Sequence, residues 1–456
     1  MDRRQFFKSG VLAGGAGLGA MPEFPGRPAA PSDHIGVGII GCGGMGHANL
    51  TDFQANADVD VVAVCDVYEP QVRKFVEETK GKAKAYRDYR KLLENRDVDA
   101  VVIATPDHWH ALPCVDACGA GKDVYVEKPI SYCIREGRLM VEAASRNGRI
   151  VQVGLQQRSG AHFQRAAQIV QSGQLGKVLS VRCWNHEVWA PEGIGNPPDS
   201  EPLPGLDWDF WLGPAPKVPF NKNRIRGGFR WFSDYAGGKL TDWGCHLIDI
   251  VVWAMGAQGP VSASACGGKY YFTDNRDTPD TLEVLYEFPA FVLHYSAMYH
   301  NTFGHNGDRG AKPFGSYGIL FYGSSGTLFI DRAGYEVIPQ TRARRLNAAV
   351  PSGDFEDLTG YNLYYESQLK PEVASTSAQH APHVRNFLDC VRSRQQPIAD
   401  IEAGHRATTV CHLGNIALRV GQKVLWDSSA ERITNIEEAN RLVTRRYRAP
   451  WRIEGL

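Results

Sequence analysis

The sequence has no excess charge of either sign and no hydrophobic run long enough to cross a membrane. Its 456 residues include 50 Lys and Arg and 50 Asp and Glu. No dense basic stripe is present that would neutralise a phosphate backbone. No segment after the N-terminal leader reaches about 18 uninterrupted apolar residues. We therefore expect neither a nucleic-acid partner nor a membrane span, and we interpret the basic stretch at residues 441–452 as a solvated helix or an oligomer-contact arm.

The ten cysteines include no CxxC pair. Several of them, such as Cys65 and Cys114, lie inside apolar segments that are predicted to be strands or helices. Such cysteines behave as small buried hydrophobic residues, and their spacing is not that of a disulfide framework or a zinc site. The sequence has no internal repeats and no low-complexity tracts. Its length of 456 residues predicts two or three globular domains.

The N-terminal segment has the pattern of an export signal. Arg3 and Arg4 precede a small-residue, weakly hydrophobic stretch at 9–20 and a Pro-rich spacer at 21–31. This pattern resembles a twin-arginine signal, and the alternative is a disordered basic leader. We therefore assign residues 1–33 to a signal and linker. The pattern predicts the twin-arginine translocase as a partner and a periplasmic or extracytoplasmic location, or a cytoplasmic one if the signal is not functional.

A glycine-rich turn lies between two apolar segments near the start of the chain. Residues 35–40 predict a buried strand, the turn runs from Gly41 to Gly46, and residues 61–65 predict a second strand. In a dinucleotide site the first glycine permits the tight turn, the second lets the backbone approach a pyrophosphate, and the third lets helix pack on strand. The phosphates then lie at a helix N-terminus. The alternative is a Gly-rich turn of an unrelated α/β fold.

Asp66 ends the second of these strands, 20 residues after Gly46. A carboxylate at this spacing can accept hydrogen bonds from the ribose hydroxyls and repels a 2′-phosphate. The sequence therefore favours NAD over NADP.

Alternating helices and strands continue to residue 155. This alternation predicts a doubly wound parallel sheet, the Rossmann arrangement, over residues 34–155. The predicted helices are 69–80, 88–96, 109–121 and 134–147, and the predicted strands are 99–104, 123–126 and 150–153.

The pattern changes in residues 156–430, for which we predict an α+β domain. Its strands have period-2 or mixed patterns, which suit an open, largely antiparallel sheet with one face covered. A long irregular insert rich in Pro, Gly and Trp occupies residues 190–226, and residues 431–456 form a C-terminal tail. The predicted strands are 178–188, 281–288, 291–299 and 318–321, and the predicted helices are 160–172, 383–394 and 405–420.

Two further motifs follow the glycine-rich turn. Glu127-Lys128-Pro129 ends a predicted parallel strand, and residues 237–246 read GGKLTDWGCH. Together, in this order, the three motifs resemble the glucose-fructose oxidoreductase, inositol dehydrogenase and rhizopine-catabolism (Gfo/Idh/MocA) family, over nearly the whole chain after the leader. The resemblance implies a homodimer or homotetramer. It also implies a cofactor site formed by Gly41, Gly43, Gly44, Met45, Gly46, Asp66, Thr105, Pro106, His110, Glu127 and Lys128.

The same resemblance places Lys128, Asp242 and His246 against the nicotinamide as catalytic residues. The residue types suit the oxidation of a carbinol, because a base must take the hydroxyl proton and His246 has a suitable reference pKa. Lys128 offers a cation to the developing alkoxide. Asp242 lies one helical turn before His246 and can orient the imidazole. The alternative is that Asp242 and His246 only cap and solvate their helix.

Residues 105–110 follow the third strand of the first domain, at the sheet edge where ligands bind. His108 and His110 in this loop have the spacing of a metal pair in some hydrolases. No second cluster with ligand spacing supports such a site, so we predict no metal. Seven of the ten tryptophans fall between residues 184 and 253. This density suggests a carbohydrate site, although for any single tryptophan a core position is the better interpretation.

These observations predict an exported NAD-dependent oxidoreductase. It would transfer a hydride between nicotinamide and a secondary hydroxyl of a sugar, cyclitol or glycoside, with a tightly bound cofactor. One alternative is a glycoside hydrolase or epimerase that uses NAD internally, by oxidation, elimination, hydration and reduction. Another is a non-catalytic sugar sensor on the same fold. Candidate hydroxyl-binding residues, by position relative to the motifs, are Arg158, His186, Arg230 and Tyr235.

Overall fold

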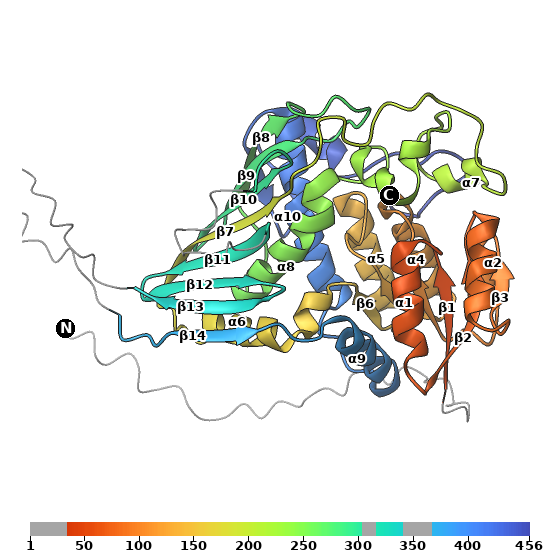
Figure 1. Cartoon of the computed structure of the whole chain (residues 1–456), viewed down its shortest axis with the longest axis horizontal. Helices are drawn as coiled ribbons and strands as arrows, with labels where there is room; N and C mark the ends of the chain where they lie inside the picture. Colours follow the sequence, from red (N-terminus) through yellow and green to blue (C-terminus); the bar gives the residue numbers. More distant parts are fainter. Residues whose placement is uncertain (1–33, 303–315, 341–366) are drawn as a thin grey trace, which may run out of the picture. The chain divides into compact units, whose positions relative to one another are not determined.

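The first sheet has six parallel strands in the order β3-β2-β1-β4-β5-β6 (Figure 1). The order changes direction after β1, as in doubly wound folds. This confirms the Rossmann prediction. The computed structural model describes residues 34–302, 316–340 and 367–456, and the predicted export signal lies outside them. The strands are β1 (Ile35–Ile40), β2 (Val59–Cys65), β3 (Lys84–Tyr86), β4 (Ala100–Ile103), β5 (Asp123–Val126) and β6 (Val151–Val153).

Five helices accompany this sheet, and their bounds differ slightly from those predicted. Strand β3 was not predicted, because its three residues are largely exposed and have no apolar pattern. The helix predicted from residue 109 begins at Ala111, since Asp107–Trp109 form a separate 3₁₀ turn. The helices are α1 (Gly44–Gln54), α2 (Glu69–Glu78), α3 (Tyr89–Leu93), α4 (Ala111–Gly119) and α5 (Ile134–Arg146).

The second sheet has ten strands in the order β14-β13-β12-β11-β7-β10-β9-β8-β15-β16. All neighbouring pairs are antiparallel except β7 and β10, which are parallel. The predicted open, largely antiparallel sheet is therefore confirmed. The strands are β7 (Val178–His186), β8 (Ser262–Gly268), β9 (Thr281–Glu287), β10 (Val292–Met298), β11 (Tyr317–Gly323), β12 (Gly326–Asp331), β13 (Gly334–Pro339), β14 (Glu372–Ser375), β15 (Val424–Asp427) and β16 (Arg432–Ile433).

Helices α6 (Ala161–Gln171), α8 (Cys245–Ala254) and α10 (Ile401–Val420) cover one face of this sheet (Figure 1). One hydrophobic cluster runs from the first sheet through α8 and α10 to the second sheet. Helix α9 (His380–Ser393) returns to the first domain, where Phe387 packs against Phe53 with ring centroids 6.0 Å apart. The two layers therefore share a continuous core, which fixes the position of the site between them.

The structure shows the surroundings of the cysteines and of the basic C-terminal stretch. Nine of the ten cysteines are buried and none forms a disulfide, as predicted, whereas Cys266 is exposed. The interpretation of the basic C-terminal stretch as a solvated helix was wrong for Arg445, whose guanidinium is nearly buried and ion-paired with Glu136 at 2.6 Å. No helix within the described part of the chain is both long enough and apolar enough to cross a membrane.

Candidate functional site

The glycine-rich turn connects β1 to α1, and steric packing requires two of its glycines. Gly41 has a φ of +99°, and an added Cβ there would lie 2.6 Å from the carbonyl carbon of Ala104. A Cβ on Gly46 would lie 2.0 Å from the carbonyl oxygen of Gly41. Gly43 and Gly44 instead face open space. The turn thus leaves backbone accessible at the N-terminus of α1, where N–H groups can bind an anion.

Asp66 lies at the carboxyl end of the neighbouring strand β2 and supports this turn. One carboxylate oxygen accepts a hydrogen bond from the backbone N–H of Cys42 at 2.7 Å, and the other accepts one from Tyr68 at 2.9 Å. Burial raises the pKa of Asp66. Each carboxylate oxygen keeps a further lone pair, so the side chain can still accept from a ribose hydroxyl.

A cavity of about 650 Å³ extends from the glycine-rich turn across the ends of β2, β4 and β5. Its volume is in the range of small-molecule sites. The first domain contributes Gly41, Gly43, Gly44, Met45, Asp66, Thr105, Pro106, Asp107, His110, Glu127 and Lys128 to its lining. The opposite wall comes from the insert and from the residues that follow it, and it includes Leu203, Leu206, Phe210, Trp211, Ile225, Phe229 and Arg230.

Lys128 and Arg230 meet at the end of this cavity and share one carboxylate. The Lys128 Nζ donates to the backbone oxygen of Asp242 at 2.7 Å and to its Oδ1 at 3.1 Å. The Arg230 Nε donates to the same Oδ1 at 2.8 Å. Burial alone would raise the pKa of Asp242, but the charges of Lys128 and Arg230 hold it well below its usual range. The carboxylate therefore stays ionised and fixes both cations at the cavity wall.

His246 lies close to this group. No hydrogen bond joins it to Asp242 within the described residues, but the Asp242 charge acts on the imidazole and favours its protonated form. Leu240–Gly244 form a π turn before α8, so Asp242 lies in this turn while His246 lies in the first turn of α8. The Nδ1 of His246 is buried and has no hydrogen-bond partner in the described ranges, and the cavity lining does not include this residue. Burial, with the nearby charges of Lys128 and Arg332, lowers the pKa of His246 well below its usual value. The imidazole is therefore neutral in the folded protein.

Asp107 belongs to the loop at residues 105–110, but no pattern in the sequence assigns it a role. Its carboxylate lines the cavity, is 6% exposed, and accepts no hydrogen bond from another described residue. Burial raises its pKa to about 7, although the charges of Arg230 and Lys128 oppose this shift. The only sequence signal for a role of Asp107 in the site is its position just after β4, at the sheet edge where ligands bind.

The two histidines of the same loop bond to backbone carbonyls. His110 Nδ1 lies 2.7 Å from the Pro129 oxygen and its Nε2 lies 2.8 Å from the Thr105 oxygen. Burial lowers the pKa of His110 to about 4. His108 Nε2 lies 3.1 Å from the Trp211 oxygen. Among the described residues, no three His, Cys, Asp or Glu side chains are grouped so that they could hold a metal ion.

Glu127, the neighbour of Lys128, is directed into the protein. Its Oε1 accepts hydrogen bonds from Asn49 at 3.0 Å and Gln156 at 3.2 Å. A Cβ on Gly154 would lie 2.5 Å from its other oxygen, so packing also confines the carboxylate. These contacts give Glu127 a supporting position in the cavity wall.

Of the four predicted hydroxyl-binding residues, the structure brings only Arg230 into the cavity lining. Arg158 is buried and forms an ion pair with Asp249, with 2.7 Å between a guanidinium nitrogen and a carboxylate oxygen. Its donors are therefore occupied. His186 Nε2 lies 3.0 Å from the Ser296 hydroxyl, between β7 and β10. Tyr235 is fully buried and its hydroxyl accepts a hydrogen bond from Arg224 at 3.1 Å.

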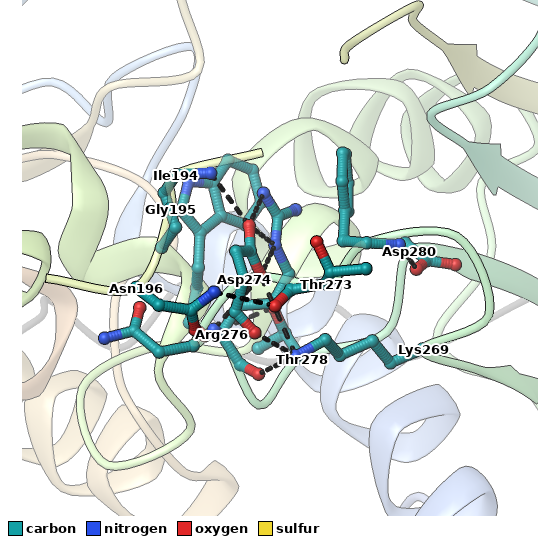
Figure 2. A network of polar contacts seen from close by, with 12 residues as sticks. Ile194, Gly195, Asn196, Lys269, Thr273, Asp274, Arg276, Thr278 and Asp280 are labelled. Carbon is teal, nitrogen blue, oxygen red and sulfur yellow. Dashed lines mark hydrogen bonds and ion pairs between the residues drawn. The ribbon is translucent and has the colours of Figure 1, made fainter. Parts of the chain in front are cut away.

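The insert is tied to the second domain through a buried ion pair (Figure 2). Asp274 binds the Arg276 guanidinium at 2.8 Å and accepts a hydrogen bond from the Ile194 N–H at 2.8 Å. The Arg276 guanidinium lies 3.7 Å from the Phe272 ring centroid and is also within cation–π distance of Trp189 and other rings. This arrangement anchors the beginning of the insert to the loop between β8 and β9.

The same insert is bound to the first domain on the other side of the cavity. Glu69 N–H donates to the Gly205 oxygen at 3.0 Å, and Asp207 N–H donates to the Val67 oxygen at 3.0 Å. The C-terminal tail adds Trp451, whose ring packs 5.2 Å from that of Phe210. The apolar wall over the cavity is therefore held from three directions.

Comparison with known proteins identifies both domains. Residues 35–155 match "Oxidoreductase family, NAD-binding Rossmann fold", and residues 159–266 and 363–453 match its "C-terminal alpha/beta domain". Inositol 2-dehydrogenase of Salmonella paratyphi B is 33% identical over 147 residues, which are 32% of this chain and 44% of that protein. The chain thus aligns with less than half the length of that relative.

Solved structures share the fold over most of the chain. Aldose-aldose oxidoreductase from Caulobacter crescentus, complexed with glycerol, has a TM-score of 0.61 at 18% identity, covering 86% of this chain and 99% of that one. The WlbA dehydrogenase from Chromobacterium violaceum, in complex with NADH and UDP-GlcNAcA, has a TM-score of 0.63 at 17% identity, covering 89% and 99%. At these identities the likeness shows the fold alone.

Proposed function

Because the chain belongs to the Gfo/Idh/MocA oxidoreductase family and its first domain is an NAD-binding Rossmann fold, we propose that it transfers a hydride between NAD and a secondary hydroxyl of a sugar, cyclitol or glycoside. One observation carries the proposal. A single cavity connects the glycine-rich turn to Lys128 and Arg230, which are held on the Asp242 carboxylate. Cofactor phosphates and a reacting oxygen therefore have binding groups in the same space.

The N–H groups at the start of α1 would hold the pyrophosphate, and Asp66 would bind the adenosine ribose. When bound, NAD supplies the hydride acceptor or donor. The Lys128 ammonium would stabilise negative charge on the reacting oxygen. His246, neutral in the folded protein, would take the hydroxyl proton, and the apolar insert wall would exclude water.

We also propose that NAD stays bound through successive turnovers of an exported protein. Arg3 and Arg4 support export, and free nicotinamide is scarce outside the cytoplasm. The insert wall, bound to Val67, Glu69 and the C-terminal tail, supports slow release. A second substrate would then restore the oxidation state of the cofactor.

The first experiment is to purify the chain without added nucleotide, denature it, and identify the released small molecule by mass spectrometry and absorbance. Stoichiometric NAD or NADH supports retention. Protein that is empty but binds added NAD leaves the oxidoreductase proposal intact and contradicts retention. Protein that cannot bind NAD contradicts both.

The second experiment measures NADH formation with a panel of sugars, cyclitols and glycosides, and assays net glycoside cleavage in parallel. Lys128→Met and His246→Ala should each lower kcat by about 10²–10⁴-fold, as expected for groups that act on the reacting oxygen. The control is Lys74→Met, because Lys74 is exposed and only pairs with Glu78 on α2. Turnover of both variants close to that of the control would contradict the site assignment.

A further inference from the structure

Two positive side chains, Lys128 and Arg332, act on His246, against the one carboxylate of Asp242. Lys128 and Arg230 both pair with that carboxylate, and their charges also act on Asp107. Arg332, at the end of β12, forms no ion pair within the described residues, yet its charge acts on His246. Buried charges without counter-ions are costly, so such groups usually meet an ionic partner when the site is filled.

Lys239 adds a fourth cation, but Glu187 already balances it through an ion pair. The neighbouring acid of Arg332 is not free to pair either. Asp331 accepts backbone hydrogen bonds from Ala333 at 2.7 Å and Gly334 at 3.1 Å. Among the described residues, Arg332 therefore forms no ion pair, and the carboxylate whose charge acts on it, that of Asp242, is already paired with Lys128 and Arg230.

Arg332 is positioned toward His246 by two contacts. Its guanidinium lies 4.6 Å from the ring centroid of Trp243, and the Trp243 ring lies 6.0 Å from that of His246. With the Gln157 amide oriented to satisfy both of its atoms, its oxygen accepts from Arg332 Nε at 3.3 Å and its nitrogen donates to the His246 carbonyl at 2.7 Å. Within the described residues, no hydrogen bond is found from the terminal nitrogens of this guanidinium.

A polar group without a partner lies on the same side of the sheet. The Trp243 ring also packs on Tyr317, at 4.8 Å, and Asn185 lies directly opposite Tyr317 in the β7–β11 ladder. Opposed residues on paired strands share a face. Asn185 is 1% exposed, and neither atom of its amide has a hydrogen-bond partner in the described ranges. An unsatisfied buried amide is a candidate for binding a ligand hydroxyl.

We propose that the sugar bound at His246 carries an anionic group, a carboxylate or a phosphate, which Arg332 binds while Asn185 reads a hydroxyl. The inference rests on the proposed function and narrows its substrate class. A guanidinium presents paired donors that match either anion, and a neutral sugar would leave the Arg332 charge without a partner.

The test measures binding to the full chain loaded with NAD, by the change in intrinsic tryptophan fluorescence. The probes are glucuronate, galacturonate and glucose 6-phosphate, each compared with its neutral hexose. We expect at least one anionic probe to bind roughly tenfold more tightly than its neutral partner, with an affinity that falls as salt rises. Arg332→Gln should abolish that difference and Arg332→Lys should retain part of it. The control is Arg146→Gln, an exposed residue of α5 that should change nothing.

The carboxylate and phosphate probes separate the two sources of the anion. Anionic probes that bind no better than neutral hexoses, or do not bind, would overturn the inference, as would an unchanged preference in Arg332→Gln. NADH formation is recorded in the same samples. Turnover of neutral sugars only would refute the anionic substrate and leave the proposed oxidoreductase intact. Binding of anionic sugars without NADH formation from any sugar in the panel would support the anion site and count against the oxidoreductase.

Discussion

Two arginine–aspartate pairs of this protein have different surroundings. The Arg158–Asp249 pair is enclosed, with side chains 7% and 1% exposed and three hydrogen bonds between them of 2.7–3.0 Å. The Arg230–Asp242 pair reaches the cavity, with side chains 27% and 16% exposed, and shares its carboxylate with Lys128. The first pair is complete without a ligand, whereas the second retains donors that face open space.

The difference shows that burial and pairing, rather than residue type, separate a structural arginine from a ligand-binding one. In the sequence, Arg158 and Arg230 were equal candidates for binding a hydroxyl. The Arg158 guanidinium donates hydrogen bonds to Asp249 and, at 3.1 Å, to the backbone oxygen of Ile398. Arg230 has one strong partner and lines the cavity.

Asp249→Asn should have the largest effect on stability. It leaves the buried Arg158 guanidinium without a counter-ion, and the loss should be about 3–5 kcal/mol in the free energy of unfolding, measured with urea. The double variant Arg158→Met/Asp249→Leu should lose less, because no charge is then left buried. A loss no larger than that for an exposed pair such as Lys74–Glu78 would contradict the enclosed character of this pair.

Asp242→Asn should act mainly on turnover. Without the carboxylate, Lys128 and Arg230 lose their common anchor and move from their positions at the reacting end of the cavity. We expect kcat to fall by about 10²-fold while NAD binding is retained. Steady-state kinetics and NAD titration on the same preparation measure both quantities. Equal loss of NAD binding and turnover would instead assign Asp242 a structural role.

Asp107→Asn should change how stability depends on pH. The folded pKa is raised from 3.8 to about 7, so between these values the folded chain holds a proton that the unfolded chain releases. The free energy of unfolding of the wild type therefore falls as pH rises through this window. The variant should lack this slope and exceed the wild type above pH 7, by up to about 4 kcal/mol. Urea unfolding of both proteins without NAD, at a series of pH values, measures this difference. If the free energies of unfolding of wild type and variant changed with pH in parallel, the prediction would be contradicted.

Arg448→Ala should have the smallest effect. Its guanidinium donates to the Gly213 oxygen at 3.0 Å and to Asp209 at 2.9 Å, at the surface of the insert. Such a pair contributes about 0–1 kcal/mol. We expect little change in Tm but NAD release a few-fold faster than in Arg446→Ala, which alters an exposed neighbour. Equal release rates in the two variants would show that the tail does not hold the insert over the cavity.

Local patterns allowed much of the first domain to be predicted. Apolar runs between glycines and helices with clear periodicity gave β1, β4, β5 and α5 within about two residues of their observed bounds. Strand β3 was not predicted, because an edge strand of three largely exposed residues has no apolar pattern. In the second domain β8 and β12 to β16 were not predicted, because such strands are defined by their pairing with neighbours rather than by their own residues.

The candidate site was predictable only in part. The sequence indicated Lys128, Asp242 and His246, but not that the Asp242 carboxylate contacts Lys128 and Arg230 rather than the imidazole. The π turn that contains Asp242 is likewise not visible as a residue pattern. The unpartnered charge of Arg332 also has no signal in the sequence, since it depends on which acids lie nearby in space.

The sequence by itself determined the order of the elements, the glycines that a tight turn requires and the acid at the end of β2. These features depend on local sterics and on periodicities of two and 3.6 residues, which the chain carries without reference to its fold. The tertiary structure alone decided which arginines are enclosed and which reach the cavity. It also decided which aromatic residues of the insert form its wall. These properties depend on burial and on charges that are distant in sequence, because solvation and Coulomb interactions act through space rather than along the chain.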